Sequence, residues 1–235
     1  MKDAKKLFSA RNVAYLGILV ALTLVMQIWG GMISIGPVQL NFSLIPIVLG
    51  AVLLGPVAGG ILGFVCGAVI TVQVIMGLAP FYVIIWEYSP VVAVLTCILK
   101  TTVAGFVSGL VYRVIAKKNT LVAMFVASGI VPVLNTGLFI LGCLCMSNAI
   151  SVFQSGIAEM AGMDIMMFIL VGLVTYNFFL EFAINLLVAP ALSTVVRIVE
   201  KNVLKKRVTE AVLNDEEEAE EAKEESAQVA EKLQE

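Results

Sequence analysis

Two charged residues lie inside long apolar segments of this chain, and they are the first candidates for chemistry. Lys100 falls near the middle of one such segment and Glu181 near the middle of another. A charge inside hydrocarbon costs about 2.5 kcal/mol or more, so residues of this kind are functional candidates by default. Asn177 and Asn185 lie four positions on either side of Glu181, which places three polar groups on one helix face. Asn135 adds an amide in a third apolar segment.

These five side chains admit two interpretations. In the first, Lys100 and Glu181 form a buried ion pair, which lowers the cost of each charge, and the amides hydrogen-bond around it. In the second, all five converge in one cavity between three helices and bind a small solute. A simple apolar bundle does not need this many polar groups on its late helices, so we favour the solute pocket.

Residue types argue against several other kinds of site. The chain has no histidine, which removes the commonest metal ligand and the usual acid–base catalyst at neutral pH. Its four cysteines lie in apolar runs without a CxxC pair, and we expect buried thiols rather than a zinc or redox site. No GxxxxGK[S/T] phosphate loop is present. We therefore expect no metal, no cofactor, no nucleic-acid partner and no catalytic residue.

The composition indicates a membrane protein. Of the 235 residues, 60% are hydrophobic and 14% are charged, whereas soluble domains carry about 25% charged residues. A helix needs about 20 mostly apolar residues to cross a bilayer. Six segments qualify and predict an all-α bundle of six transmembrane helices, with a tight hairpin at Gly55–Pro56 between the second and third. These segments are residues 13–32, 38–54, 57–79, 91–115, 121–146 and 165–196.

Basic residues predict the orientation of the bundle, because Lys and Arg accumulate on the cytoplasmic side of membrane proteins. With six spans, twelve of the thirteen Lys and Arg residues before position 208 fall on one side, and the other, Lys100, is inside a span. The opposite side carries Glu87, Glu159 and Asp164 and no cation. We therefore expect both termini in the cytoplasm and the protein in the cell membrane.

The loops on the outer side are rich in apolar and aromatic residues. Pro80 and Pro90 interrupt the segment 79–90, which brings Tyr82, Trp86 and Tyr88 to the membrane interface. These rings form either an aromatic belt or, for Trp86 in particular, part of a ligand site. In 147–164, apolar residues recur at helical spacing and predict a short amphipathic helix over the outer mouth. They are Ile150, Phe153, Ile157 and Met160.

Two stripes of small residues predict close helix contacts. Gly55, Gly59, Gly63 and Gly67 recur every four residues and favour tight packing between two helices of the bundle. Ala10, Ala14, Gly17 and Ala21 form a second stripe on the first span, whose other residues are bulky. This second stripe fits either an internal helix contact or an external partner.

The end of the chain differs from the rest in charge. Residues 208–235 contain eleven acidic residues and two lysines, whereas residues 1–207 carry a net positive charge. The acidic segment has no aromatic residue and little apolar surface to bury. We therefore divide the chain into a membrane domain, 1–207, and an acidic cytoplasmic tail, 208–235, that we expect to be disordered.

Four segments resemble the substrate-binding S components of energy-coupling factor (ECF) transporters. They are ARNVAYLGILVALTLVMQ, LNFSLIPIVLGAVLLGPVAGGILGF, VPVLNTGLFILG and NFFLEFAINLLVAPAL, which together extend over most of residues 10–192. The resemblance implies a six-helix membrane subunit that binds a vitamin or related micronutrient from outside. It also implies a transmembrane coupling protein and two cytoplasmic ATPase subunits as partners. The family's AxxxA contact to the coupling protein matches Ala10-xxx-Ala14 and continues through Gly17 and Ala21.

Two questions stay open beside this resemblance: whether the protein has an alternative function, and which solute it binds. A stand-alone secondary transporter driven by an ion gradient would use Lys100 and Glu181 for coupling, although such carriers usually contain internal repeats and none is apparent here. An intramembrane enzyme has little support without histidine. A lysine within the membrane suits an anion, so a carboxylate-bearing vitamin such as pantothenate is one hypothesis for the solute.

Overall fold

The computed structural model describes residues 9–35, 38–160, 162–199 and 201–202. The chain divides into two compact units, residues 1–193 and 194–235. The described part of the second unit, residues 194–199 and 201–202, is helical. The predicted acidic tail and the N-terminal lysines at positions 2, 5 and 6 lie outside the described residues.

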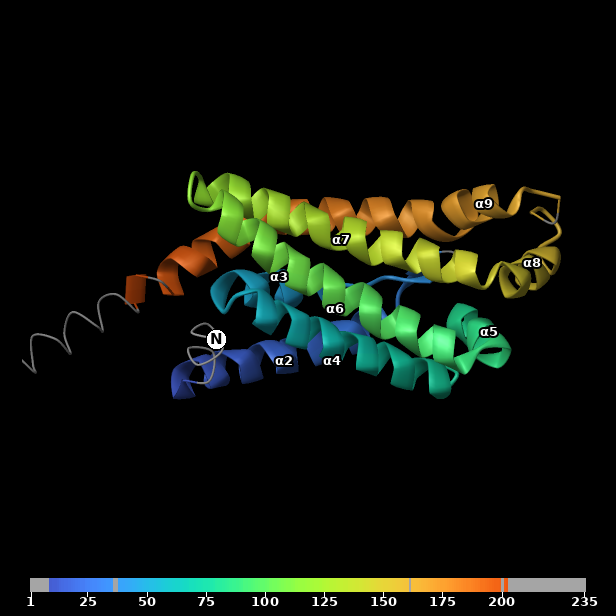
Figure 1. The fold of residues 1–235 in the computed structure, drawn as a ribbon, viewed down its shortest axis with the longest axis horizontal. Coiled ribbons are helices and arrows are strands. Elements are labelled where there is room, and N and C mark those ends of the chain that lie inside the picture. The colour runs from blue at the N-terminus through green and yellow to red at the C-terminus, as the bar shows by residue number, and fades with distance from the viewer. Residues whose placement is uncertain (1–8, 36–37, 161, 200, 203–235) are drawn as a thin grey trace, which may run out of the picture. The chain divides into compact units, whose positions relative to one another are not determined.

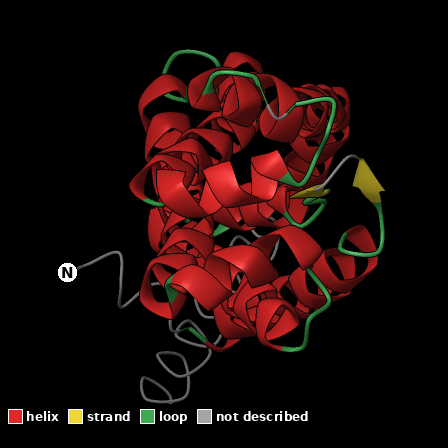
Figure 2. Ribbon diagram, turned by 90° about the vertical axis from the view of Figure 1, so that its right-hand side faces the viewer, coloured by secondary structure: helices red, strands yellow, loops and turns green. Residues whose placement is uncertain are grey.

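The described chain is almost entirely helical, with two short strands (Figure 2). Its last long helix, Ile165–Val199, begins with α9 and the π-helix η1 and continues as regular α-helix. The labelled elements are α2 (Ala10–Gly30), β1 (Ser34–Ile35), β2 (Val38–Gln39), α3 (Leu44–Leu53), α4 (Pro56–Ile75), α5 (Pro80–Tyr88), α6 (Pro90–Ile115), α7 (Thr120–Cys145), α8 (Ser147–Ser155), α9 (Ile165–Met167) and η1 (Phe168–Val174).

Five of the described helices are long and apolar enough to cross a membrane. They are α2, α4, α6, α7 and the last helix. The second predicted span, 38–54, is only partly helical: α3 has ten residues, and residues 38–43 form β2 and a turn instead. β1 and β2 pair antiparallel, with Ser34 opposite Gln39. The prediction of a helix from residue 38 was therefore wrong.

The tight hairpin predicted at Gly55–Pro56 is confirmed. Gly55 has φ +104°, a conformation that side chains other than glycine rarely adopt, and Pro56 is the first residue of α4. Built on Gly55, a Cβ would collide with the Arg113 guanidinium near the end of α6. The α3–α4 turn therefore lies next to the basic end of α6, which the sequence predicts to be cytoplasmic.

Helix α6 lies in the middle of the bundle and packs most extensively against α4 and α7 (Figure 1). The glycines of α4 allow this contact. A Cβ at Gly67 would lie 2.6 Å from the Cys97 carbonyl oxygen, and the Thr101 hydroxyl donates a 2.6 Å hydrogen bond to the Gly63 carbonyl. The prediction that Gly59, Gly63 and Gly67 serve helix packing is confirmed, since all three face the backbone of α6.

Two short helices, α5 and α8, lie at the end of the bundle opposite the α6–α7 connection (Figure 1). Residues 80–88 form a regular helix between the two prolines, so Pro80 begins α5 rather than breaking it. α8 ends at Ser155, which leaves Ile157 and Met160 outside the helix predicted for them. The rings of Phe81, Tyr82 and Phe139 pack edge to face or tilted, with centroids 5.6 to 5.8 Å apart.

Candidate functional site

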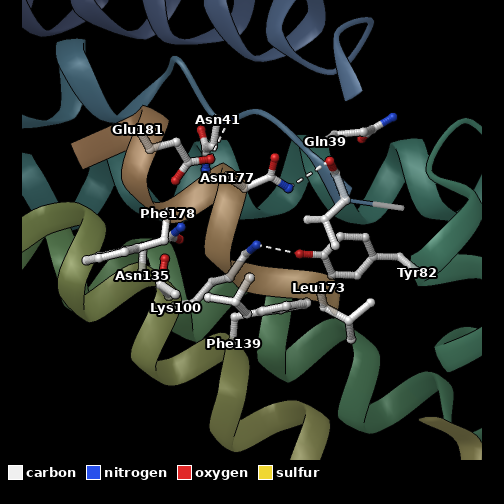
Figure 3. A pocket seen from close by; sticks show the side chains of 13 residues that line it. Gln39, Asn41, Tyr82, Lys100, Asn135, Phe139, Leu173, Asn177, Phe178 and Glu181 are labelled. Carbon is white, nitrogen blue, oxygen red and sulfur yellow. Dashed lines mark hydrogen bonds between the residues drawn. The ribbon is translucent and has the colours of Figure 1, made fainter. Parts of the chain in front are cut away.

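A cavity opens between α5, α6, α7, the last helix and the segment 38–41. Four of the predicted solute-binding residues line it: Lys100, Asn135, Asn177 and Glu181. Figure 3 shows these side chains, which come from three long helices, gathered around one space. The cavity volume open to water-sized molecules is about 30 Å³, which is room for about two waters. A larger solute therefore requires lining side chains to move.

Asn185 and Trp86, the other two predicted binding residues, lie outside the cavity lining. Asn185 is buried one helical turn beyond Glu181, and its Nδ2 donates a 2.8 Å hydrogen bond to the Glu181 carbonyl oxygen. Trp86 is half-buried on α5. Tyr82, on the same short helix, lines the cavity in its place and is 4% exposed.

Lys100 reaches across the cavity to Tyr82. Its Nζ donates a 2.6 Å hydrogen bond to the Tyr82 hydroxyl and lies 5.0 Å from the centre of that ring and 5.3 Å from the centre of the Phe139 ring. Cations are attracted to aromatic faces at such distances. Burial raises the pKa of the Tyr82 phenol, so this group is a neutral hydrogen-bond partner rather than a counter-charge. Within the described residues, no carboxylate forms a salt bridge with Lys100.

Glu181 and Lys100 are hydrogen-bonded to different groups. Its Oε1 accepts a 2.8 Å hydrogen bond from the backbone N–H of Asn41, 140 positions earlier in the chain. The Nδ2 of Asn177 donates a bond of the same length to the Val38 carbonyl oxygen. The buried ion pair considered from the sequence is therefore not formed in the described structure. Glu181 and Asn177 instead hold the non-helical segment 38–41 against the last helix (Figure 3).

Non-helical backbone inside a membrane is tolerated where it is buried in protein or lines a cavity. The segment 38–41 meets this condition. Polar side chains bond the Asn41 N–H and the Val38 carbonyl, and Val38, Gln39 and Asn41 contribute to the cavity wall. A buried network continues from it. The Ser43 hydroxyl has both Gln27 Oε1, at 3.1 Å, and Asn41 Oδ1 within hydrogen-bond distance of its single proton, and Gln27 Nε2 donates to Gln73 Oε1 at 3.1 Å.

Sequence reasoning missed this second polar cluster. The available signal was a set of amides and hydroxyls inside otherwise apolar segments, at Gln27, Asn41, Ser43 and Gln73. Cys66 belongs to the cluster, with its Sγ 2.8 Å from the Ser43 hydroxyl.

Three of the four cysteines are buried as expected, but Cys145 is exposed. Among the described residues, no group of three or more His, Cys, Asp or Glu side chains could hold a metal ion.

Several polar atoms of the residues at the cavity have no hydrogen-bond partner in the part of the chain that the structure describes. They are the Asn41 Nδ2, the Asn135 Oδ1 and the Asn177 Oδ1, all of them buried. Because Asn177 donates through Nδ2 and Asn41 accepts through Oδ1, these two amides are oriented by their bonds. An unpaired buried polar group costs about 1–3 kcal/mol. All three residues that carry these atoms line the cavity.

The structure also places the small-residue stripe of α2. Ala10, Ala14, Gly17 and Ala21 are all exposed, and no other part of the described chain lies within 4 Å of a Cβ built on Gly17. The opposite face of α2 supplies the buried residues Leu19, Thr23 and Gln27. Of the two alternatives from the sequence, the internal helix contact is therefore wrong, and the stripe faces outward from the bundle.

The fold and the cavity define a membrane-embedded helical bundle with a polar interior site. A family model described as ECF transporter, substrate-specific component matches residues 11–193. The chain belongs to this family, as the resemblance predicted. It is a multi-pass membrane protein and a substrate-specific transport subunit rather than an enzyme. A comparison with curated proteins finds no significant match.

Proposed function

We propose that this subunit captures a vitamin or related micronutrient in the cavity between α6, α7 and the last helix. The observation that carries the proposal is the set of unpartnered polar atoms of Asn41, Asn135 and Asn177 around Lys100 and Glu181. Ligand sites typically combine apolar and aromatic walls with a few placed polar groups. Tyr82, Phe139 and Phe178 supply the aromatic part of this wall.

The chain crosses the membrane six times in this proposal, with both termini in the cytoplasm. The second crossing combines the ten residues of α3, about 15 Å long, with residues 38–43. The four residues before the turn, 38–41, add at most about 14 Å, so together the two parts approach the thickness of a hydrocarbon core of about 30 Å. Arg11, Arg113, Lys117 and Lys118 then lie on the cytoplasmic side, while Glu87, Glu159 and Asp164 lie outside.

Energy for uptake comes from other chains in this proposal, because the sequence has no phosphate loop of its own. A transmembrane coupling protein and two cytoplasmic ATPase subunits are the partners that the family implies. The exposed stripe Ala10, Ala14, Gly17 and Ala21 is the docking face for the coupling protein. Small side chains let two helix backbones approach closely in lipid.

Reconstitution tests this function directly. The full chain, placed in liposomes with an energy-coupling module, should accumulate a labelled vitamin only when the module hydrolyses ATP. Pantothenate and a mixture of other vitamins are the first probes. Uptake by the chain alone, driven by a proton or sodium gradient, would instead support the secondary transporter. Failure of any small solute to bind or accumulate would contradict both functions.

A further inference from the structure

The cavity contains two opposite charges that do not neutralise each other directly. Lys100 is 6% exposed and bonds a neutral phenol, and Glu181 is 5% exposed and accepts from a backbone N–H. A buried charge is expensive unless it is paired. Both residues line one cavity, so a molecule that occupies it can contact both.

The known contacts of Glu181 do not require its negative charge. One amide oxygen, such as that of glutamine, would accept the single hydrogen bond from the Asn41 N–H equally well. A carboxylate offers about four lone-pair sites, so most of its accepting capacity remains for another group. The same reasoning applies to Lys100, which has three N–H donors and uses one on Tyr82.

The unpartnered amide atoms add to this demand. Asn135 Oδ1 and Asn177 Oδ1 both need hydrogen-bond donors, as does the free capacity of Glu181. Of the two charged groups that line the cavity, Lys100 offers hydrogen-bond donors and Glu181 offers acceptors. A simple anion would satisfy Lys100 but leave the Glu181 carboxylate without a cationic partner.

We infer that the solute is zwitterionic: an acidic group lies at Lys100, and a cationic, N–H-rich group lies among Glu181, Asn135 and Asn177. This inference rests on the proposed function and specifies the class of its substrate. A solute of this kind neutralises both buried charges and supplies donors to the two amide oxygens. Lys100 keeps two N–H donors for the acidic group beside its bond to Tyr82.

Two measurements on the full-length protein in lipid nanodiscs test the inference. In the first, small molecules released by denaturation are identified by mass spectrometry, and the main one should carry both an acidic and a basic group. In the second, thermal unfolding is followed with ω-amino carboxylates of two to six carbons, and with the matching simple carboxylates and amines. At least one amino carboxylate should raise the midpoint of unfolding at millimolar concentration, whereas its carboxylate and amine counterparts should not.

Two substitutions test which residue binds the acidic group of the solute and which binds the cationic group. Glu181→Gln keeps an oxygen for the Asn41 N–H, so the fold should survive while preference for the amino carboxylate over the simple carboxylate falls at least tenfold. Lys100→Met should reduce the preference for the amino carboxylate over the simple amine by a similar factor. Glu159→Gln and Lys118→Met change exposed charges outside the cavity and should leave both preferences unaltered. If Lys100→Met does not fold, Glu181→Gln alone decides.

The outcomes separate this inference from the proposed function. A released solute with charge of one sign, or equal protection by simple carboxylates, would overturn the zwitterion and leave the transport function standing. The absence of any released or protecting compound would contradict the transport function, and the inference with it.

Discussion

Asn177 and Val38 lie 139 positions apart in the chain, yet the Nδ2 of Asn177 donates a 2.8 Å hydrogen bond to the Val38 carbonyl oxygen. This bond joins the last helix to the non-helical segment that borders the cavity. Asn177 also lines the cavity, and its Oδ1 has no hydrogen-bond partner among the described residues. One side chain therefore holds the segment and belongs to the proposed solute site.

Replacing Asn177 with alanine should loosen the segment 38–43 as well as weaken solute binding. A hydrogen bond contributes about 0.5–1.5 kcal/mol, so amide hydrogen exchange in this segment should accelerate by about threefold to tenfold. Mass spectrometry of peptides from the protein in nanodiscs measures this change. The exposed Asn148→Ala serves as the control. Unchanged exchange in 38–43 would show that Glu181 alone holds the segment.

The π-helix η1, Phe168–Val174, lies shortly before Asn177 and Glu181 in the last helix, and we expect it to set which way they face. A π-turn accommodates one extra residue in a helix and often occurs at functional sites. Deleting the half-exposed Val171 should therefore return this region to regular α-helix, with the cavity residues still in place and binding retained. Deleting Tyr176, which lies in regular helix, should turn Asn177 and Glu181 by about 100° relative to residues before it.

Comparison of the two deletions in a solute-binding assay checks this role for the π-helix. Tyr176 is 70% exposed and Val171 is 44% exposed, so neither deletion removes a core side chain. Equal loss of binding in both proteins would contradict a phasing role for η1.

The contact between α4 and α6 should tolerate no added carbon at Gly67. A Cβ at this position would lie 2.6 Å from the Cys97 carbonyl oxygen and 2.6 Å from the Ile98 Cα, and backbone atoms cannot move aside independently. Gly67→Ala should therefore destabilise the protein, by about 1–3 kcal/mol on the scale of overpacked cores. Thermal unfolding in detergent measures the difference.

Gly137→Ala is the matched control for this substitution. Gly137 is also within a long helix, α7, but nothing lies within 4 Å of a Cβ built on it. Alanine is favoured over glycine in a helix by about 1 kcal/mol, so this variant should unfold at the same temperature as the parent or higher. A stable Gly67→Ala variant would show that the two helices can separate without loss of structure.

Much of the fold could be predicted from hydropathy because each long helix is apolar along its whole length. The helical break at Gly55–Pro56 also followed from local residue chemistry. The segment 38–43 could not be predicted, because its apolar residues look like the start of a span. Its actual conformation depends on hydrogen bonds from Asn177 and to Glu181, which are distant in sequence.

Only part of the candidate site was predicted, because its residues, like segment 38–43, also depend on partners distant in sequence. Buried polar residues such as Lys100 and Asn135 stand out within apolar segments, and the cost of exposing them to lipid brings them to one interior cavity. Their partners do not stand out. Tyr82 resembled a membrane-interface aromatic, and its bond to Lys100 depends on how α5 folds back over α6.

The orientation of the bundle can be tested with single cysteines. In a background where the exposed Cys145 is replaced by serine, cysteines at Glu87 and Glu159 should react with an impermeant maleimide added to intact cells. A cysteine at Lys118 should react only after the membrane is opened. These results follow if the end of the bundle that carries α5 and α8 faces outward. Labelling of position 118 in intact cells would reverse the proposed topology.

The outward-facing stripe of α2 leads to the last prediction. Ala14→Leu adds a branched side chain at the centre of the stripe and should hinder close approach of a partner helix, because small residues are what permit backbone contact in lipid. Co-purification with the energy-coupling module should fall about tenfold or more, whereas solute binding to the isolated chain should be unaffected. Val13→Leu is the matched control, since Val13 is 48% exposed on the same helix and lies outside the stripe. If Ala14→Leu and Val13→Leu assemble equally well with the module, the stripe faces lipid rather than a coupling protein.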